Sequence, residues 1–134
     1  MEKRVSERPV AGFNLVAVIG HEGLCLHWDG ALRAVRLGPG PHVLSSNRDV
    51  DDPDLPEKRV FDRAMAGAGP LPAVADLQSF LASHEDHRPV CKHGDALGTV
   101  SSTIYVGRET SPLLLHAEGP PCRTAFRDLS ELLR

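Results

Sequence analysis

The sequence predicts an α+β fold in which mostly antiparallel sheets are combined with two main helices. Short β-leaning segments joined by glycine-containing turns fill the first third of the chain. Two segments near the middle repeat apolar residues at helical spacing, and two further strand-like segments follow them. Because strands joined by short turns pair antiparallel, we expect little parallel sheet.

The first third of the chain predicts four strands. A β-branched apolar segment and an alternating segment flank a turn with Gly20 and Gly23 at its ends, which is typical of a β-hairpin. A third alternating segment follows, and Gly-Pro-Gly-Pro separates it from a short fourth one. The four expected strands cover residues 13–19, 24–29, 31–37 and 42–46.

The rest of the chain predicts two helices and a second hairpin. Residues 49–56 contain four aspartates and two prolines, so they form neither a regular strand nor a helix interior. The expected helices cover residues 57–67 and 73–84, and the expected strands cover residues 99–109 and 111–119. Residues 124–134 are expected to be a short helix or a tail.

Length and composition favour one domain over residues 1–134, with a charged segment at 1–11 that we expect to be disordered. Apolar residues make up 41% of the chain but aromatic residues only 4%, so Leu, Val and Ala must build the core. A net charge of −3 argues against a nucleic-acid-binding face, which would need a basic surface.

The three cysteines are widely spaced and odd in number, which favours a reducing compartment over a disulfide framework. Cys25 lies within a strand and is expected in the core, whereas Cys122 follows two prolines and is expected to be packed. The N-terminus has no secretory pattern, and the apolar run at 15–19 is too short to span a bilayer. We therefore expect a cytoplasmic protein without a membrane partner.

Residues 45–48, Ser-Ser-Asn-Arg, follow an expected strand and place several polar groups at its end. The amide of Asn47 can donate to a developing oxyanion, and Arg48 can bind a carboxylate or phosphate in a forked geometry. The alternative is a turn in which Asn caps its own backbone and the following acids are solvated.

Residues 84–95 gather zinc-type ligands in a short segment. They are His84, His87, Cys91, His93 and Asp95. Their spacing matches no common zinc finger, and the chain has no Cys-x2-Cys. The favoured interpretation is loop histidines with one buried cysteine and no metal or cofactor, while zinc or haem remains the alternative.

Residues 99–103, Thr-Val-Ser-Ser-Thr, alternate in the expected strand. Period two places Val100, Ser102 and Ile104 on one face, which we expect to be buried, and Ser101 with its flanking threonines on the other. That second face presents hydroxyls to a pocket or to solvent, and the alternative is an ordinary Thr/Ser-rich strand.

Four segments in one order resemble the C-terminal half of the NRDE family, also called the transport-and-Golgi-organization type. They are GFNLVAV (12–18), HVLSSNRDVDDPDLPEKR (42–59), VCKHGDALGTVSSTIYVG (90–107) and LLLHAEGPPC (113–122). The last two segments also resemble the end of acyltransferases related to penicillin acyltransferase. Those proteins are N-terminal-nucleophile hydrolases, so the resemblance implies part of an α-β-β-α sandwich.

The resemblance also implies roles for four residues. In that class an N-terminal cysteine is the nucleophile, its own amino group is the base, and a strand-end asparagine helps to hold the oxyanion. Asn47 would take the oxyanion or substrate-contact role, Arg48 would contact an anionic substrate, and Ser101 and Ser102 would lie near the cleft. None of the three cysteines is placed as the nucleophile, because the chain lacks the family's N-terminal half.

The implied activity is amide hydrolysis or acyl transfer that requires a missing segment or a partner chain. The alternative is a non-catalytic module that binds an acyl or lipid-like ligand or haem. Because a lone half-sandwich exposes sheet edges, we expect a homodimer or a partner chain. We also expect Asn47 to point into a concave site while Asp51, Asp52 and Asp54 face water.

Overall fold

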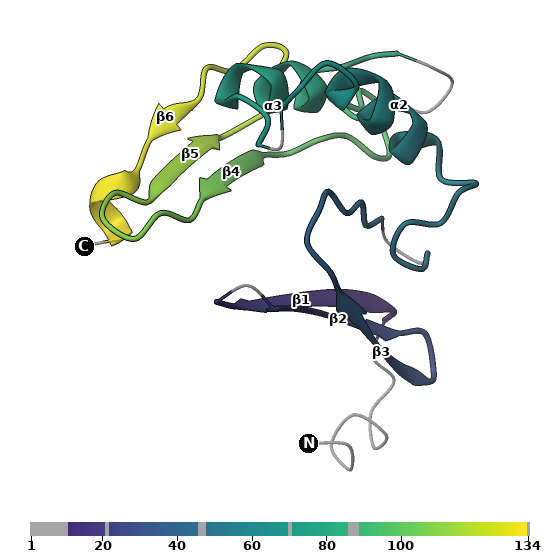
Figure 1. Cartoon of the computed structure of the whole chain (residues 1–134). Coiled ribbons are helices and arrows are strands. Elements are labelled where there is room, and N and C mark those ends of the chain that lie inside the picture. The colour runs from purple at the N-terminus through teal and green to yellow at the C-terminus, as the bar shows by residue number, and fades with distance from the viewer. Residues whose placement is uncertain (1–10, 21, 46–47, 70, 86–88, 134) are drawn as a thin grey trace. The chain divides into compact units, whose positions relative to one another are not determined.

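The computed structural model describes residues 11–20, 22–45, 48–69, 71–85 and 89–133. Over these residues the fold is α+β, with two α-helices and two small antiparallel sheets (Figure 1). The expected fold class is therefore confirmed at this level. The chain divides into two compact units, Met1–Lys58 and Arg59–Arg134, and each contains one of the two sheets.

The sheet of the first unit is an antiparallel meander (Figure 1). Its strands are β1 (Phe13–Ile19), β2 (Glu22–Trp28) and β3 (Leu32–Leu37), in the order β1-β2-β3. The predicted hairpin and third strand are confirmed, although β2 begins two residues earlier than expected. Gly20 has a φ of 59° at the first turn, in the left-handed region that glycine enters without steric cost.

The two faces of this sheet carry different side chains. Paired residues share a face, so Val16, Cys25 and Val35 lie together; Cys25 is 2% exposed, whereas the two valines are each 43% exposed. Asn14 lies on the same face and donates to the carbonyl of Ser45 over 2.7 Å, which ties the loop after β3 to this face. The opposite face carries more large apolar side chains: Leu15, Leu24 and Leu32 are exposed, and Phe13, Leu26 and Trp28 are half-buried.

The expected fourth strand is wrong, because residues 42–45 form an irregular loop. This loop pairs with Asp51 instead of with a neighbouring strand. The amide of Val43 donates to Asp51 Oδ1 over 2.8 Å, and the amide of Asp51 donates to the carbonyl of Val43 over 3.0 Å. Asp51 has a φ of 57°, a left-handed conformation that aspartate tolerates better than most residues.

His42 also contacts Asp51; we call the contacts of Asp51 with His42 and Val43 the clamp. Its Nδ1 lies 2.6 Å from Asp51 Oδ2, and its Nε2 lies 2.9 Å from the carbonyl of Gly38. Both partners only accept hydrogen bonds, so the arrangement favours the doubly protonated, charged imidazole. The expectation that Asp51 and Asp52 face water is therefore wrong, since their side chains are 32% and 17% exposed, whereas Asp54 is exposed as expected.

The second unit combines two helices with a small sheet, and the first helix begins before the boundary between the units. The helices are α2 (Pro56–Met65) and α3 (Val74–Leu81). The sheet contains β4 (Ser102–Val106), β5 (Leu113–Ala117) and β6 (Arg127–Asp128), in the order β4-β5-β6. The rings of Phe61 and Phe80 pack edge to face with their centroids 5.2 Å apart. In the sheet, Ile104 and Ala117 are buried. Both predicted helices and the β4–β5 hairpin are confirmed with shorter bounds.

One expectation for the second unit is wrong, and a second is met only in part. Residues 99–101 lie outside β4, and Val100 is 83% exposed, whereas Ser102 is half-buried and Ile104 is buried. The short helix expected near the end of the chain is present in part, as a 3-10 helix (Ser130–Leu133), and the short strand β6 precedes it. The reason is pairing with β5, because the amide of Leu129 donates to the carbonyl of Leu114 over 2.8 Å.

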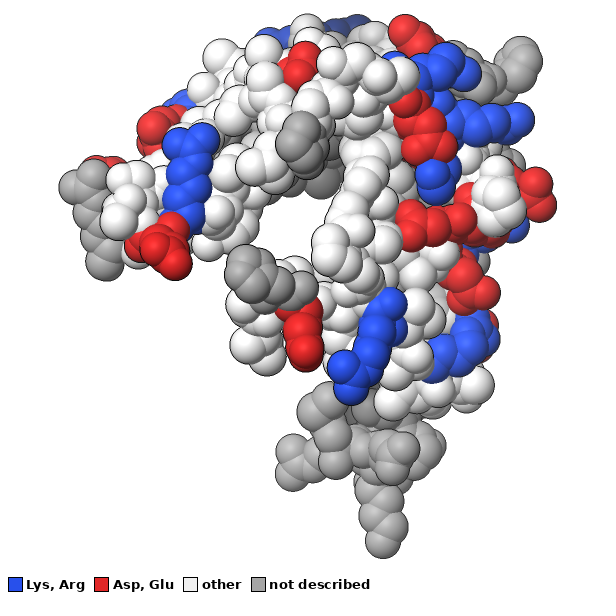
Figure 2. All heavy atoms as spheres, viewed as in Figure 1, with Lys and Arg blue, Asp and Glu red and all other residues white. Residues whose placement is uncertain are grey.

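Charged side chains on the face in Figure 2 lie beside side chains of the opposite sign in most places. Arg33 contacts both Asp29 and Asp49 at 3.0 Å, and Arg48 contacts Asp52 at 3.1 Å.

Within the described part of the chain, no helix is both long enough and apolar enough to cross a membrane.

The clamp between His42 and Asp51 predicts a pH dependence for the first unit. The hydrogen bond to Asp51, and then that to Gly38, raises the pKa of His42. Burial opposes ionisation of Asp51, but the bonds from His42 and Val43 lower its pKa overall. The stabilisation from His42 is complete below about pH 6.5 and is lost as the pH rises through the raised pKa, while that from Asp51 is complete above about pH 3.9 and is lost on acidification.

We therefore expect the wild type to exceed His42→Gln in free energy of unfolding by about 1 kcal/mol near pH 5, and by less near pH 8.5. Urea unfolding followed by the fluorescence of Trp28, the one tryptophan in the chain, reports on this unit. Comparison with the variant cancels the titration of other groups. A wild-type advantage that stays constant across this pH range would contradict the ion pair.

Candidate metal centre

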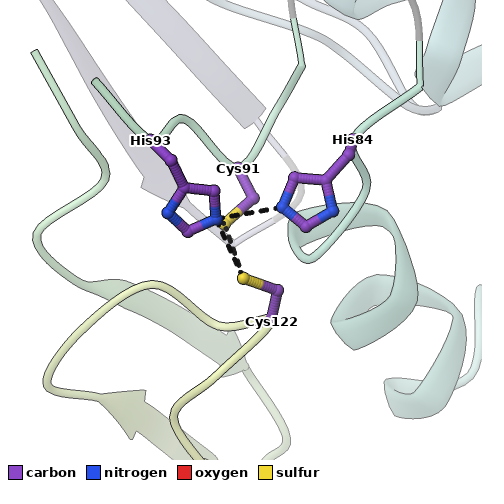
Figure 3. Close-up of side chains that lie close together, drawn as sticks. All are labelled: His84, Cys91, His93 and Cys122. Atoms are coloured by element: carbon purple, nitrogen blue, oxygen red, sulfur yellow. Dashed lines mark hydrogen bonds between the residues drawn. The ribbon is translucent and has the colours of Figure 1, made fainter.

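Two histidines and two cysteines of the second unit converge on one point (Figure 3). They are His84, Cys91, His93 and Cys122, and their potential ligand atoms all lie within 4.8 Å of one another. Cys91 is fully buried, Cys122 is half-buried, and both histidines are exposed. The cluster thus closes over a buried sulfur and is accessible from its histidine side.

The end of α3 positions His84 and Cys91. The helix ends where the amide of Ala82 donates to the carbonyl of Gln78 over 3.0 Å, and His84 follows two residues later. The amide of Cys91 then donates to the carbonyl of Ser83 over 3.0 Å. This bond holds Cys91 next to the helix end, although the two residues it joins are well separated in the chain.

A tight turn positions His93. The amide of Lys92 donates to Thr99 Oγ1 over 2.9 Å, and the amide of Thr99 donates to the carbonyl of Lys92 over 2.9 Å. Inside this turn, a Cβ on Gly94 would lie 2.8 Å from the carbonyl oxygen of Leu97. Only glycine fits there without movement of the backbone, so the Lys-His-Gly sequence is matched to the turn.

A second turn brings Cys122 to the cluster after β5. The amides of Arg123 and Thr124 both donate to the carbonyl of Pro120 over 3.0 Å. Gly119 starts this turn, and a Cβ there would lie 2.5 Å from Thr124 Oγ1. The Gly-Pro-Pro-Cys sequence therefore forms a compact corner that presents Cys122 to the two histidines (Figure 3).

The distances within the cluster approach those of a tetrahedral zinc site. Zinc–sulfur and zinc–nitrogen bonds of about 2.3 and 2.0 Å place neighbouring ligand atoms roughly 3.3–3.8 Å apart. The two sulfurs lie 3.6 Å apart, and Cys91 Sγ lies 3.6 Å from His93 Nε2. His93 Nε2 also lies 3.0 Å from His84 Nε2 and from Cys122 Sγ, so these pairs would need to separate by a few tenths of an ångström.

The surroundings of the cluster lower the pKa of His93 and raise the pKa of Cys122. Burial lowers the pKa of His93, and the charges of Arg123 and His84 lower it further. Burial raises the pKa of Cys122, as does its contact with Cys91, while Arg123 acts in the opposite sense. His93 is therefore poised to donate a lone pair, whereas a metal ion must displace a proton from Cys122.

The sequence identified three of these four residues. His84, Cys91 and His93 belong to the predicted ligand-rich segment, whereas Asp95 is exposed and outside the cluster. His87 lies outside the described residues. The burial of Cys91 is confirmed, and the four side chains together could hold a metal ion, so the expected absence of metal remains a prediction.

Sequence reasoning missed the role of Cys122, which contacts Cys91 across 31 positions. The available signal was indirect: Gly-Pro-Pro-Cys follows the strand that pairs with β4, and the loop with Cys91 and His93 leads into β4. The hairpin thus returns the chain to the start of β4, where the ligand-rich loop ends.

The residues assigned by family resemblance belong to both units of the chain. Asn47 lies outside the described residues. Arg48 belongs to the first unit, is exposed and pairs with Asp52. Ser101 is exposed and Ser102 is half-buried in β4, opposite Ala117. Their roles in substrate contact remain predictions.

Comparison with protein-family models, curated proteins and solved structures gave no match to this chain. The resemblance to the NRDE family therefore remains an expectation from the sequence. The convergence of two thiols and two imidazoles is an observation on the structure itself, and it is independent of any relative.

Proposed function

We propose that the second unit binds one zinc ion through His84, Cys91, His93 and Cys122, and that the ion has a structural role. The observation that carries this proposal is the approach of four ligand atoms to within 4.8 Å of one another. A set of four protein ligands fills a tetrahedral zinc ion and leaves no open position, which is typical of structural sites.

The chemistry of the donors selects the type of ion. Thiolates and imidazoles suit Zn²⁺, whereas Mg²⁺ and Ca²⁺ prefer oxygen ligands. Two thiolates also balance the charge of a divalent ion, so its burial against the side chain of Cys91 leaves no net charge in the centre. The two imidazoles complete the coordination on the exposed side of the cluster.

The need for a metal follows from the weak core around these loops. Among the described residues between α3 and β4, only Cys91 is buried. The large apolar side chains Leu97 and Val100 are 82% and 83% exposed, so they add little to the packing of this long segment. Because long loops need other ties when apolar packing is missing, a metal ion that joins three segments would supply them.

Binding of Co²⁺ as a zinc analogue tests this proposal. The wild type should take up one ion and develop the intense visible absorption of tetrahedral cobalt with thiolate-to-metal charge transfer. About 10–16 kcal/mol of binding free energy shared among four ligands corresponds to roughly 3 kcal/mol each. Cys122→Ser and His93→Gln should each therefore weaken binding by about 100-fold.

Two variants serve as matched controls for this titration. Cys25→Ala removes the remaining cysteine, which lies in the first unit, and His116→Gln changes a histidine of β5 outside the cluster. Both should keep the cobalt spectrum and affinity of the wild type. Absence of a tetrahedral spectrum in the wild type, or equal binding by Cys122→Ser, would refute the site.

Removal of the ion should loosen the second unit more than the first. A ligand at 100 times its dissociation constant stabilises the state that binds it by about 2.7 kcal/mol. Native-state hydrogen exchange before and after dialysis against EDTA measures this locally. The amides of Cys91, Thr99 and Arg123 close the ligand-bearing turns and should exchange faster without metal.

The strand amides paired between β1 and β2 provide the internal control for this exchange measurement. They belong to the first unit and should exchange equally with and without EDTA. Equal exchange of the turn amides in both samples would argue against a structural role for the ion, even if binding itself were demonstrated.

Amide hydrolysis or acyl transfer of the NRDE type remains a second proposal that rests on sequence resemblance alone. It would require a segment or partner chain that brings the cysteine nucleophile, and Asn47, Arg48, Ser101 and Ser102 would contact the substrate. Binding of an acyl ligand or haem without catalysis belongs to the same group. We place these functions below metal binding because no contact among the described residues supports them directly.

A further inference from the structure

The two sulfurs of the metal centre lie close enough to react with each other. Cys91 Sγ and Cys122 Sγ are 3.6 Å apart, and both cysteines are free thiols (Figure 3). A disulfide has a sulfur–sulfur bond of about 2.05 Å, so the sulfurs would need to approach by roughly 1.6 Å. This approach requires a movement of the turn that carries Cys122, which is half-buried.

The two thiols differ in their accessibility. Cys122 is half-buried and lies on a turn, whereas Cys91 is fully buried and its amide is fixed to the carbonyl of Ser83. A small oxidant therefore reaches Cys122 first, and Cys91 lies in position to attack the oxidised sulfur. An accessible thiol with a second thiol beside it is the arrangement in which a sulfenic acid is resolved to a disulfide.

We propose that a hydroperoxide converts Cys91 and Cys122 into a disulfide and that this oxidation releases the bound metal. The O–O bond of the peroxide breaks as Cys122 becomes a sulfenic acid and the first water or alcohol leaves. Cys91 then attacks that sulfur, the S–S bond forms, and the sulfenic oxygen leaves as water with the hydrogen of the second thiol. In the zinc-bound protein both sulfurs start as thiolates, so the two protons come from solvent. Two electrons pass from the two sulfurs to the peroxide, which balances the reaction.

Release of the metal follows from the loss of two ligands. Thiolates bind zinc, whereas the sulfurs of a disulfide do not, so only His84 and His93 would remain. This part of the inference rests on the proposed metal-binding function. Formation of the disulfide does not, because it depends only on the approach of the two sulfurs.

The third cysteine should not participate. Cys25 belongs to the first unit, is 2% exposed and lies within β2. A thiol that peroxide cannot reach does not react with it. Oxidation should therefore yield one specific intramolecular disulfide.

The experiment treats reduced full-length protein, with zinc and without it, with hydrogen peroxide. Peptide mass mapping should find one disulfide joining Cys91 to Cys122 in both samples, and a colorimetric chelator should detect one zinc released for each disulfide formed. Dithiothreitol should restore both thiols and zinc binding. Cys25→Ala should behave like the wild type, while Cys91→Ser should leave Cys122 as a sulfenic acid that dimedone traps.

The outcomes separate the two proposals. Bound zinc with no disulfide, or with disulfides to Cys25 or to other molecules, would overturn the redox inference and leave the metal site intact. Formation of the disulfide in protein that never binds zinc would overturn metal release and the proposed function, but would keep the thiol pair. Because the main readout uses the unmodified chain, the result does not depend on the folding of a variant.

Discussion

The scarcity of buried apolar side chains is the constraint on which the rest of this structure depends. Among the described residues, the buried apolar core contains two cysteines, three β-branched residues, one leucine and one alanine. Burial of so few side chains stabilises a fold only modestly, at about 1.5–3 kcal/mol for each large one. Specific polar and sulfur contacts must therefore fix the loops.

The two units meet this constraint in different ways. In the first unit, one carboxylate, that of Asp51, closes an irregular loop by pairing with the amide of Val43 and the imidazole of His42. In the second unit, hydrogen bonds between Lys92 and Thr99 shape a turn, and the convergent histidines and cysteines join that turn to α3 and to the loop after β5. In both units, polar and sulfur-containing side chains fix loops that apolar packing would hold in a larger protein.

The sequence was most informative where structure depends on neighbours along the chain. Alternating residues in β1 and β2, and the helical periodicity of α3, identified those elements because each pattern matches a local geometry. The predicted strand at residues 42–46 failed because β propensity does not reveal whether a pairing partner is available. Asp51 instead took that role, although an acidic residue in a proline-rich segment is usually solvated.

The candidate site shows the same limit at longer range. His84, Cys91 and His93 were recognised as metal-type ligands because they lie in one short segment, but their spacing alone did not indicate convergence. The fourth member, Cys122, arrives through the β4–β5 hairpin, and no pattern in one sequence reports a contact over 31 positions. Asn47, the residue that the family resemblance emphasised most, lies outside the described residues.

The face of the β1–β2–β3 sheet that carries Leu15, Trp28 and Leu32 makes the first unit sensitive to its surroundings. Leu15 and Leu32 on this face are 50% and 49% exposed, and Trp28 lies beside them. Any apolar surface that settles on these side chains gains about 25 cal/mol for each Å² removed from water. The stability of the first unit should therefore depend on protein concentration, on detergent and on contact with vessel walls. The fluorescence emission of Trp28 should change when any of these covers the face.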